Sequence, residues 1–422
     1  MKNKKKIIFI EPHMDGPRGH HMDSLIAKSV ALRKYGKICW IVSNKYKQRQ
    51  ADIPKHVKII NVLDTAKRGI FFFNIKNTVN TFFLILKNFF LSAVIIFQLL
   101  RRREFSWIYP FFYNFCSFPK YLPSIFSSFE NLQVNQNDQI IFNSCSDLND
   151  YELAFFLYFY KKNPPAFHML IRSLPKFQKK KIKTPIYFLK KININEKNNF
   201  KKKFFLYAET EKNKSIIFKN YRIAINLFHD CYFFSTKTRV TKKINIGFFG
   251  EARANKGFEK YLSLIKEGHK LDNGLNFTIQ FSSVPNEFVG TKKEILKYIK
   301  KNKTVKCIPK YISYTKYRKF LTTIDIAPIM YDHALLDQVG SGVVFSCIAN
   351  EIPMIIPSNS SIKKKFKHNC YLEAVDIKDY AKKIIEIQKN YTYFLQESKK
   401  EAKYLQEKFH SYPFLDRIKK IT

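Results

Sequence analysis

The stretch Lys243–Gly257, KINIGFFGEARANKG, decides how the second half of this chain folds. Its apolar opening, INIGFF, predicts a buried β-strand that ends at Gly250. Two cations, Arg253 and Lys256, follow, and a helical pattern begins at Gly257. Such a strand, basic loop and helix N-terminus can bind an anion, because backbone N–H groups and the helix dipole face the loop. Arginine offers a planar fork and lysine a compact charge, so a diphosphate suits the pair. An ordinary strand–loop–helix with solvated basic residues fits these residues equally well.

Strands and helices alternate after this stretch. Strands are expected at 277–282, 305–308, 325–330 and 353–357, and helices at 257–271, 290–301, 313–323 and 342–350. A long helix is expected over Lys378–Phe409. This alternation predicts a parallel sheet with helices on both faces, the doubly wound α/β class.

The first half of the chain shows the same order. A strand at 6–10 precedes a polar loop with Gly16 and Gly19, and a helix is expected over 20–35. Further strands are expected at 37–42, 57–62, 139–142, 168–171, 204–208 and 223–228, with a helix at 150–160. Glycines let a backbone approach a ligand closely, and ligands of doubly wound sheets gather at the carboxyl ends of the strands. His20 and His21, at the helix start, could equally be ordinary capping-region residues.

An apolar segment interrupts the first half within an insertion at about 68–132. Phe82–Leu100 is nineteen residues long and is followed by Arg101–Arg103. That length only just suffices to span a bilayer. A span would place two parts of one sheet on opposite sides of a membrane, so a buried or interfacial helical segment is favoured. The aromatic residues after it suit a membrane interface.

Charge and composition limit the function classes. The 422 residues carry a net charge of +42 with 45% hydrophobic residues, which indicates a folded protein attracted to polyanions. Its seven cysteines show no CxxC pair and no zinc spacing, which predicts reduced core thiols in a cytoplasmic protein. The apolar run at the N-terminus is too short for a signal peptide. We expect domains at 1–234 and 244–410, a linker at 235–243, and a tail at 411–422 that could pack back on the first domain.

Two stretches carry a resemblance to a known family. GEARANKG and the segment IDIAPIMYDHALLDQVGSGVVFSCIANEIPMIIP at Ile324–Pro357 resemble the retaining GT-B glycosyltransferases of family 4, also called group 1. The resemblance implies two Rossmann-like domains that face each other across a cleft. It also implies transfer of a sugar from a nucleotide-diphosphate sugar to a glycan or lipid-linked acceptor, in surface polysaccharide or glycolipid synthesis. No metal or other cofactor is implied, and the enzyme would be cytoplasmic or peripheral on the inner membrane face.

The resemblance assigns roles to individual residues. Arg253 and Lys256 correspond to the diphosphate-binding pair and, with Gln338, form the implied catalytic set. The implied donor-binding residues are Gly16, Gly19, Gly250, Asp337, Ser341, Gly342 and Ser346. His20 and His21 are assigned to the acceptor side.

The chain departs from the family at two positions. The family commonly has two glutamates with seven residues between them, and Gln338 and Ser346 stand at those positions. Both side chains can still hydrogen-bond a hydroxyl, and Asp337 could replace part of the lost charge. Two alternatives therefore stay open, an inactive GT-B scaffold that serves as a partner subunit and a basic nucleic-acid-binding protein. No nucleic-acid recognition motif supports the second alternative.

Overall fold

The computed structural model describes residues 5–11, 19–43, 53–63, 97, 122–145, 164–171, 203–221, 225–228, 232, 234, 243–250, 252–281, 284–308, 312, 314–332, 341–410 and 413–420. The chain forms two compact units. Unit 1 comprises Met1–Arg18, Lys28–Phe228 and Tyr412–Thr422, and unit 2 comprises Gly19–Ala27 and His229–Ser411.

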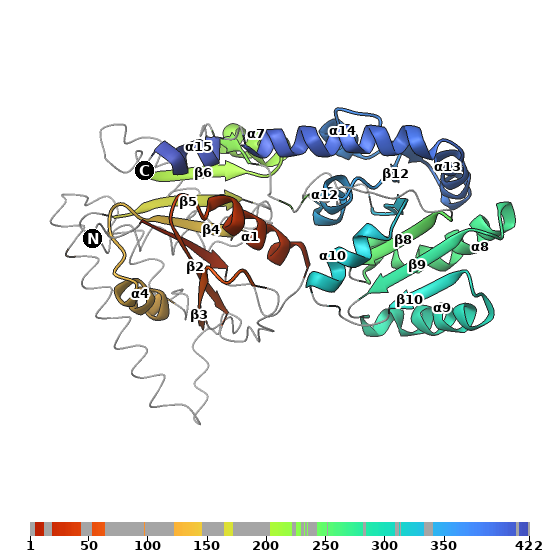
Figure 1. The fold of residues 1–422 in the computed structure, drawn as a ribbon, viewed down its shortest axis with the longest axis horizontal. Helices are drawn as coiled ribbons and strands as arrows, with labels where there is room; N and C mark the ends of the chain where they lie inside the picture. Colours follow the sequence, from red (N-terminus) through yellow and green to blue (C-terminus); the bar gives the residue numbers. More distant parts are fainter. Residues whose placement is uncertain are drawn as a thin grey trace, which may run out of the picture. The chain divides into compact units, whose positions relative to one another are not determined.

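Unit 1 contains a seven-stranded parallel sheet (Figure 1). Its strands are β1 (Lys6–Glu11), β2 (Lys37–Ser43), β3 (Val57–Leu63), β4 (Gln139–Cys145), β5 (Ala166–Ile171), β6 (Phe204–Ala208) and β7 (Asn226–Leu227). The order is β3-β2-β1-β4-β5-β6-β7. Strands β2 and β3 thus lie on one side of β1, and β4 to β7 lie on the other side. This is the doubly wound topology expected from the sequence.

Helices of unit 1 bury apolar faces. Helix α1 (Gly19–Leu32) is divided between the two units after Ala27, and the helices wholly in unit 1 are α4 (Leu122–Asn131), α7 (Glu211–Tyr221) and α15 (Pro413–Lys420). The last of these comes from the end of the chain, and its Phe414 ring lies edge-on to His168 with ring centroids 5.6 Å apart. Lys5 Nζ donates to the Ile418 carbonyl at 2.9 Å. Helix α15 therefore completes the core of unit 1 around β5 and β6.

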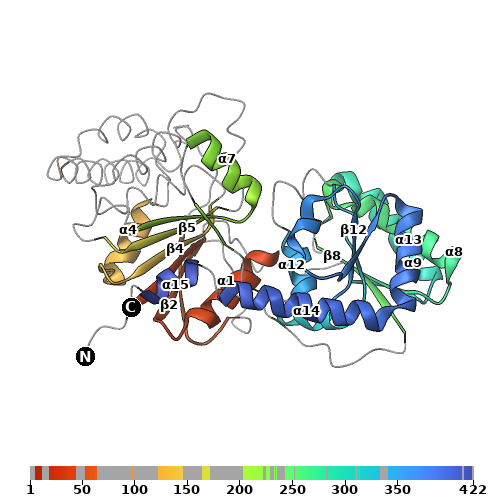
Figure 2. The ribbon, with the colours of Figure 1, turned by 90° about the horizontal axis from the view of Figure 1, so that it is seen from above.

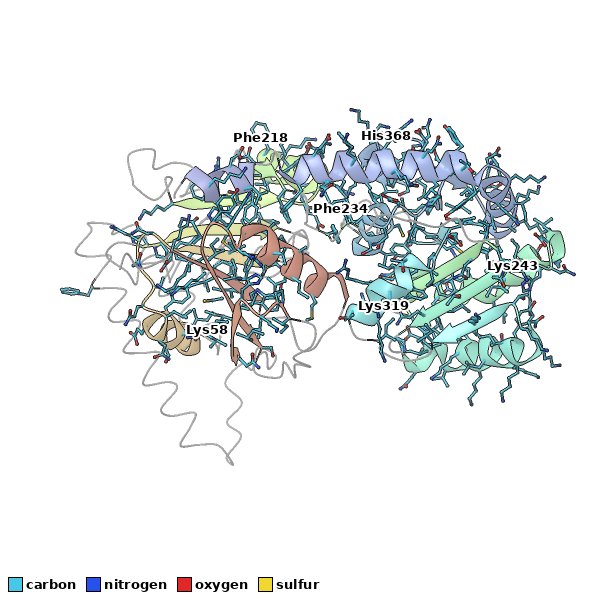
Figure 3. All side chains as sticks on the ribbon, in the orientation of Figure 1. Lys58, Phe218, Phe234, Lys243, Lys319 and His368 are labelled. Atoms are coloured by element: carbon cyan, nitrogen blue, oxygen red, sulfur yellow. The ribbon has the colours of Figure 1, made fainter. Side chains whose placement is uncertain are left out.

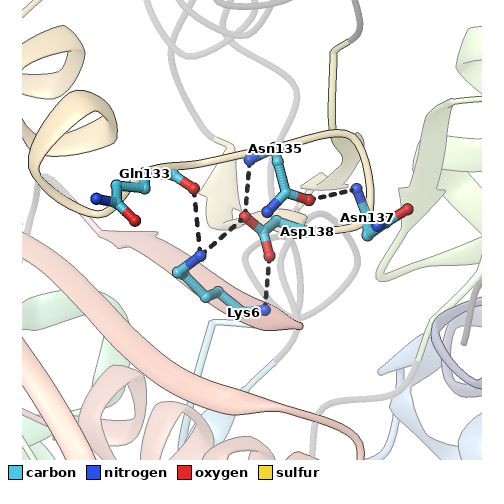
Figure 4. A network of polar contacts seen from close by, with 5 residues as sticks. All are labelled: Lys6, Gln133, Asn135, Asn137 and Asp138. Atoms are coloured by element: carbon cyan, nitrogen blue, oxygen red, sulfur yellow. Dashed lines mark hydrogen bonds and ion pairs between the residues drawn. The ribbon is translucent and has the colours of Figure 1, made fainter. Parts of the chain in front are cut away.

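A polar network ties the start of β1 to the turn before β4 (Figure 4). Asp138 Oδ1 accepts the backbone N–H of Lys6 at 2.7 Å, and Oδ2 accepts that of Asn135 at 2.9 Å. Lys6 Nζ lies 3.5 Å from Oδ2 and donates to the Gln133 carbonyl at 3.2 Å. Because Asp138 is fully buried, this network supplies the partners that its charge needs.

Unit 2 has a second doubly wound sheet. Its strands are β8 (Asn245–Gly250), β9 (Asn276–Phe281), β10 (Val305–Ile308), β11 (Ala327–Pro328), β12 (Met354–Pro357) and β13 (Tyr371–Ala374). They form two parallel groups, β10-β9-β8 and β11-β12-β13, which a parallel bridge between Ile246 and Ile326 joins. The resulting order, β10-β9-β8-β11-β12-β13, is that of a Rossmann-like sheet.

Helices cover both faces of this sheet (Figure 2). One apolar layer packs Ile246, Phe248 and Ile355 against α8 (Tyr261–Leu271), α9 (Val289–Lys301) and α13 (Ile377–Lys389). The other layer packs Phe249, Met354 and Ile356 against α10 (Tyr314–Thr322) and α12 (Gly342–Ala349), with α14 (Tyr391–His410) beyond. Alternate residues of β8 and β12 thus enter opposite layers, as the two-residue period of a strand requires.

The structure differs from several of the expected elements; the strand expected at 223–228, for example, is only Asn226–Leu227 as β7. The strand expected at 325–330 is only two residues long as β11, Ala327–Pro328, although Ile326 before it bridges to Ile246 and Ile329 N–H after it donates to the Ile355 carbonyl at 2.7 Å. The long helix expected over Lys378–Phe409 is two helices that meet at Asn390, whose side chain donates to the Glu386 carbonyl at 3.1 Å and closes α13. Strand β13 and helix α7 were not expected.

Two expectations concern the membrane and the cysteines. Among the described residues, no helix combines the length and apolar character needed to cross a membrane. The apolar segment Phe82–Leu100 lies outside the described residues except for Phe97. Cys39, Cys307, Cys347 and Cys370 are free thiols. Burial raises the pKa of Cys307 to about 11, which keeps this thiol protonated near neutral pH.

Candidate functional site

The loop after β8 is built around two glycines. Gly250 ends the strand with a φ of 124°, and Gly257 has a φ of 71° between two short 3-10 turns, Ala254–Lys256 and Phe258–Lys260. A β-carbon at Gly257 would collide with the carbonyl of Met330. Only glycine combines this left-handed backbone with such a close approach. The loop therefore packs directly against the chain that follows β11.

Several backbone N–H groups of this loop donate to carbonyls within it. Lys256 N–H donates to the Arg253 carbonyl at 3.0 Å and Gly257 N–H to the Ala254 carbonyl at 2.8 Å. Helix α8 begins only at Tyr261, after the second 3-10 turn. The helix expected from 257 thus begins as a 3-10 turn at Phe258, and its α-helical part starts at Tyr261. The positive charge of this loop comes from the side chains of Arg253 and Lys256.

Lys256 lies where the loop meets the start of α12. A β-carbon built on Gly250 would lie 3.8 Å from Lys256 Nζ and 3.6 Å from Val343 Cγ2. Gly250 thus leaves space between the ammonium group and the first turn of α12. Arg253, in extended conformation, precedes the first 3-10 turn and is exposed. The structure therefore brings together Gly250, Lys256 and the beginning of α12.

Helix α12 supplies a buried helix N-terminus. Ser341 is its N-cap, and the Ser341 hydroxyl accepts the N–H of Val344 at 3.4 Å. Gly342 is the first helical residue, and the N–H groups of a first turn have no acceptor within their helix. The dipole of α12 adds positive potential at this end. Ser346 lies one turn further along and is only 3% exposed.

Tyr331 is a site residue that the sequence reasoning missed. Lys256 Nζ lies 5.7 Å from the centroid of its ring. The side chain is 7% exposed, and its phenolic oxygen is buried beside the Ser341 side chain. Burial raises the pKa of Tyr331, while the neighbouring Ser341 and Arg253 oppose this rise. The phenol is thus neutral, and Ser341, Arg253 and Lys256 all lie near it. The sequence signal for it was its position three residues after Pro328, at the end of the expected strand 325–330.

The other predicted site residues cannot be placed around this loop. Gly16, Asp337 and Gln338 lie outside the described residues. Gly19, His20 and His21 form the first turn of α1, and their side chains are likewise not described. Within the part of the chain that is described, no group of three His, Cys, Asp or Glu side chains could hold a metal ion.

Two Rossmann-like sheets of this order in one chain define the GT-B fold, and solved structures match it over nearly the whole length. A mutant of TarM from S. aureus has a TM-score of 0.60 at 12% identity, covering 99% of this chain and 99% of its own. A glycosyltransferase from Rickettsia africae ESF-5 has a TM-score of 0.59 at 11% identity, with 99% of both chains covered. HepE from Anabaena has a TM-score of 0.56 at 9% identity, covering 99% of this chain and 98% of its own. No family model matches the sequence, and no curated protein matches it.

Proposed function

We propose that this protein is a glycosyltransferase that takes a sugar from a nucleotide-diphosphate sugar. The observation that carries the proposal is the basic loop after β8, which brings Lys256 to the start of α12. Two side-chain cations and a helix N-terminus suit the two phosphates of a diphosphate. The fold supports the same reading, since structures of TarM and HepE with this fold are complexes with UDP.

The proposed chemistry depends on stabilising the leaving group. As the bond between the sugar and the diphosphate breaks, negative charge grows on the phosphate oxygens. Arg253 and Lys256 would stabilise that charge through charge-assisted hydrogen bonds. Gln338 would hydrogen-bond the sugar, and the acceptor hydroxyl would attack with retention of configuration, its proton passing to the departing diphosphate. This scheme needs neither a protein nucleophile nor a metal ion.

Further residues have proposed roles in the same reaction. Gly250, Asp337, Ser341, Gly342 and Ser346 would line the donor site of a C-terminal domain at 244–410. Gly16 and Gly19 would approach the donor sugar from an N-terminal domain at 1–234, with 235–243 as the linker. His20 and His21 would lie on the acceptor side.

We further propose that the acceptor is a glycan or a lipid-linked precursor at the cytoplasmic membrane face. The net charge of +42 supports attraction to an anionic membrane, at about 1 kcal/mol for each Lys or Arg near the surface. Exposed lysines such as Lys243 and Lys319 illustrate this surplus (Figure 3). Reversible binding to anionic vesicles that weakens with salt is expected, and absence of binding at low salt would contradict it.

A thermal-shift panel tests the proposed function. UDP, GDP and ADP are added to the full-length protein, because a ligand that binds only the folded state raises its Tm. One nucleotide diphosphate should raise the Tm more than the others, and the matching nucleotide sugar should then release that diphosphate when an acceptor is added. A protein that binds a nucleotide diphosphate but never forms one from the nucleotide sugar would be the inactive scaffold. A protein that binds none of them, and is shifted only by oligonucleotides, would be the nucleic-acid-binding alternative.

A further inference from the structure

Tyr331 lies where the elements of the proposed diphosphate site meet. The loop after β8 is fixed to the segment that contains it, since Asp332 N–H donates to the Asn255 carbonyl at 3.0 Å. Gly257 of the same loop packs against the backbone of Met330, the residue before Tyr331. The residues that flank Tyr331 in sequence therefore both contact the loop that carries Lys256.

The ring of Tyr331, and not its hydroxyl, faces the cation. Lys256 Nζ lies 5.7 Å from the ring centroid, within the range of cation–π attraction. The phenolic oxygen is buried beside the Ser341 side chain. The ring is therefore the part of Tyr331 that contacts Lys256.

We propose that Tyr331 is a positioning residue whose ring holds the Lys256 ammonium group in place for an incoming diphosphate. The inference rests on the proposed function, because it assumes that Lys256 contacts phosphate. A lysine side chain loses much rotamer freedom when it is fixed, and a preformed position reduces that loss at the moment of binding. Replacing the ring by an aliphatic side chain should weaken diphosphate binding about three- to tenfold.

The test compares two substitutions in the full-length protein. Isothermal titration calorimetry measures affinity for UDP and for inorganic pyrophosphate, which removes any dependence on the base. Tyr331→Phe keeps the ring and removes only the hydroxyl beside Ser341, so it should bind both probes like the parent protein. Tyr331→Leu should bind both probes about three- to tenfold more weakly.

A double-mutant cycle separates positioning from general damage to the site. If the ring acts through Lys256, Tyr331→Leu should change affinity by less than about twofold in a Lys256→Ala background. Tyr404→Leu is the matched control, because it removes a ring of α14 whose centroid lies 4.9 Å from Lys367 Nζ. This control should leave both affinities unchanged.

The outcomes distinguish the inference from the proposed function. If the parent protein binds neither UDP nor pyrophosphate, the diphosphate site itself fails, and the proposed function loses its main support. If the parent protein binds them and Tyr331→Leu binds them equally well, only the positioning role is overturned. A loss of affinity in Tyr331→Phe as large as that in Tyr331→Leu would also overturn it, as would an undiminished effect of Tyr331→Leu in the Lys256→Ala background.

Discussion

The buried carboxylate of Asp138 accepts the backbone N–H of Lys6 at 2.7 Å. An equivalent contact occurs in unit 2, where Asp325 accepts the backbone N–H of Asn245 at 2.9 Å. In both units the aspartate lies just before the strand that pairs with, or bridges to, the first strand of its sheet. In both sheets, therefore, a buried aspartate joins the two central strands by accepting a backbone N–H at the start of the first strand, although the surrounding sequences differ.

Replacing Asp138 should destabilise the protein. Asp138→Asn leaves one carboxamide oxygen for two backbone N–H donors and removes the charge beside Lys6. We expect a loss of about 2–3 kcal/mol in the free energy of unfolding, measured by urea denaturation. Asp416→Asn is the control, because it breaks a half-exposed ion pair with Lys419 and should cost less than about 1 kcal/mol. Equal effects of the two changes would contradict the role of this network.

Gln133 should be replaceable by glycine with a gain in stability. It follows α4 with a φ of 49°, and its N–H and that of Val134 donate back to the carbonyls of Glu130 and Phe129. This is a Schellman C-cap, whose left-handed residue is most often glycine. Gln133→Gly should raise the free energy of unfolding by about 1 kcal/mol, because it relieves the β-carbon contact. Gln136→Gly, at a position without positive φ, should lower stability instead.

Gln133→Gly and Gln136→Gly should change the free energy of unfolding in opposite directions. Both exchange an exposed glutamine for glycine a few residues apart, so they alter the unfolded chain in the same way. Differential scanning calorimetry of the two variants gives the comparison directly. A lower Tm in Gln133→Gly would show that the left-handed conformation is not costly for glutamine here.

His168 should make folding sensitive to acid. It is fully buried, with Nε2 2.6 Å from Gln139 Oε1 and Nδ1 3.2 Å from the Tyr207 hydroxyl. Burial, aided by the charges of Arg417 and Lys5, lowers its pKa from 6.5 to about 3. As the pH falls, the imidazole of His168 is therefore protonated in the unfolded chain before it is protonated in the folded protein. The stabilising contribution of His168 is complete above pH 6.5 and is lost as the pH falls towards 3. At about 1.4 kcal/mol per pH unit, the loss reaches a few kcal/mol at about pH 4.

The control for acid sensitivity is His168→Phe. The carboxylates titrate equally in both proteins. The difference between the two proteins in the slope of unfolding free energy against pH, from pH 6.5 to 4, is therefore due to His168. Urea denaturation at several pH values measures it. Parallel pH profiles for the two proteins would show that His168 is not held neutral in the folded state.

Arg253→Ala and Lys256→Ala should each raise the donor KM and lower kcat. The leaving diphosphate gains charge in the transition state, and each charge-assisted contact is worth about 2–3 kcal/mol, or roughly 30- to 150-fold in kcat/KM. The Tm without ligand should change little. Lys260→Ala is the control, since Lys260 is an exposed lysine of the next 3-10 turn and should not affect turnover. Wild-type kinetics in both variants would mean that the donor site lies elsewhere.

Short continuous apolar runs were enough to predict most strands. Segments such as 245–250 and 37–43 are buried on both faces, and continuous apolar runs of that length indicate the interior of a parallel sheet. Gly250 and the cations at 253 and 256 could be identified in the same way, because they follow a strand directly. Periodicity could not predict that β11 is only two residues long, because strand ends depend on backbone pairing with β8 and β12.

What the sequence determined by itself was therefore local: the doubly wound order of strands and helices, and the basic loop with its glycine turn. Only the tertiary structure decided which distant residues meet there. The contact of Lys256 with the Tyr331 ring, and the space that Gly250 leaves beside Val343, join segments far apart in the chain. Such contacts depend on how strands lie side by side in a sheet and on which side chains fill the space between them. Local propensity and pattern contain no information on either point.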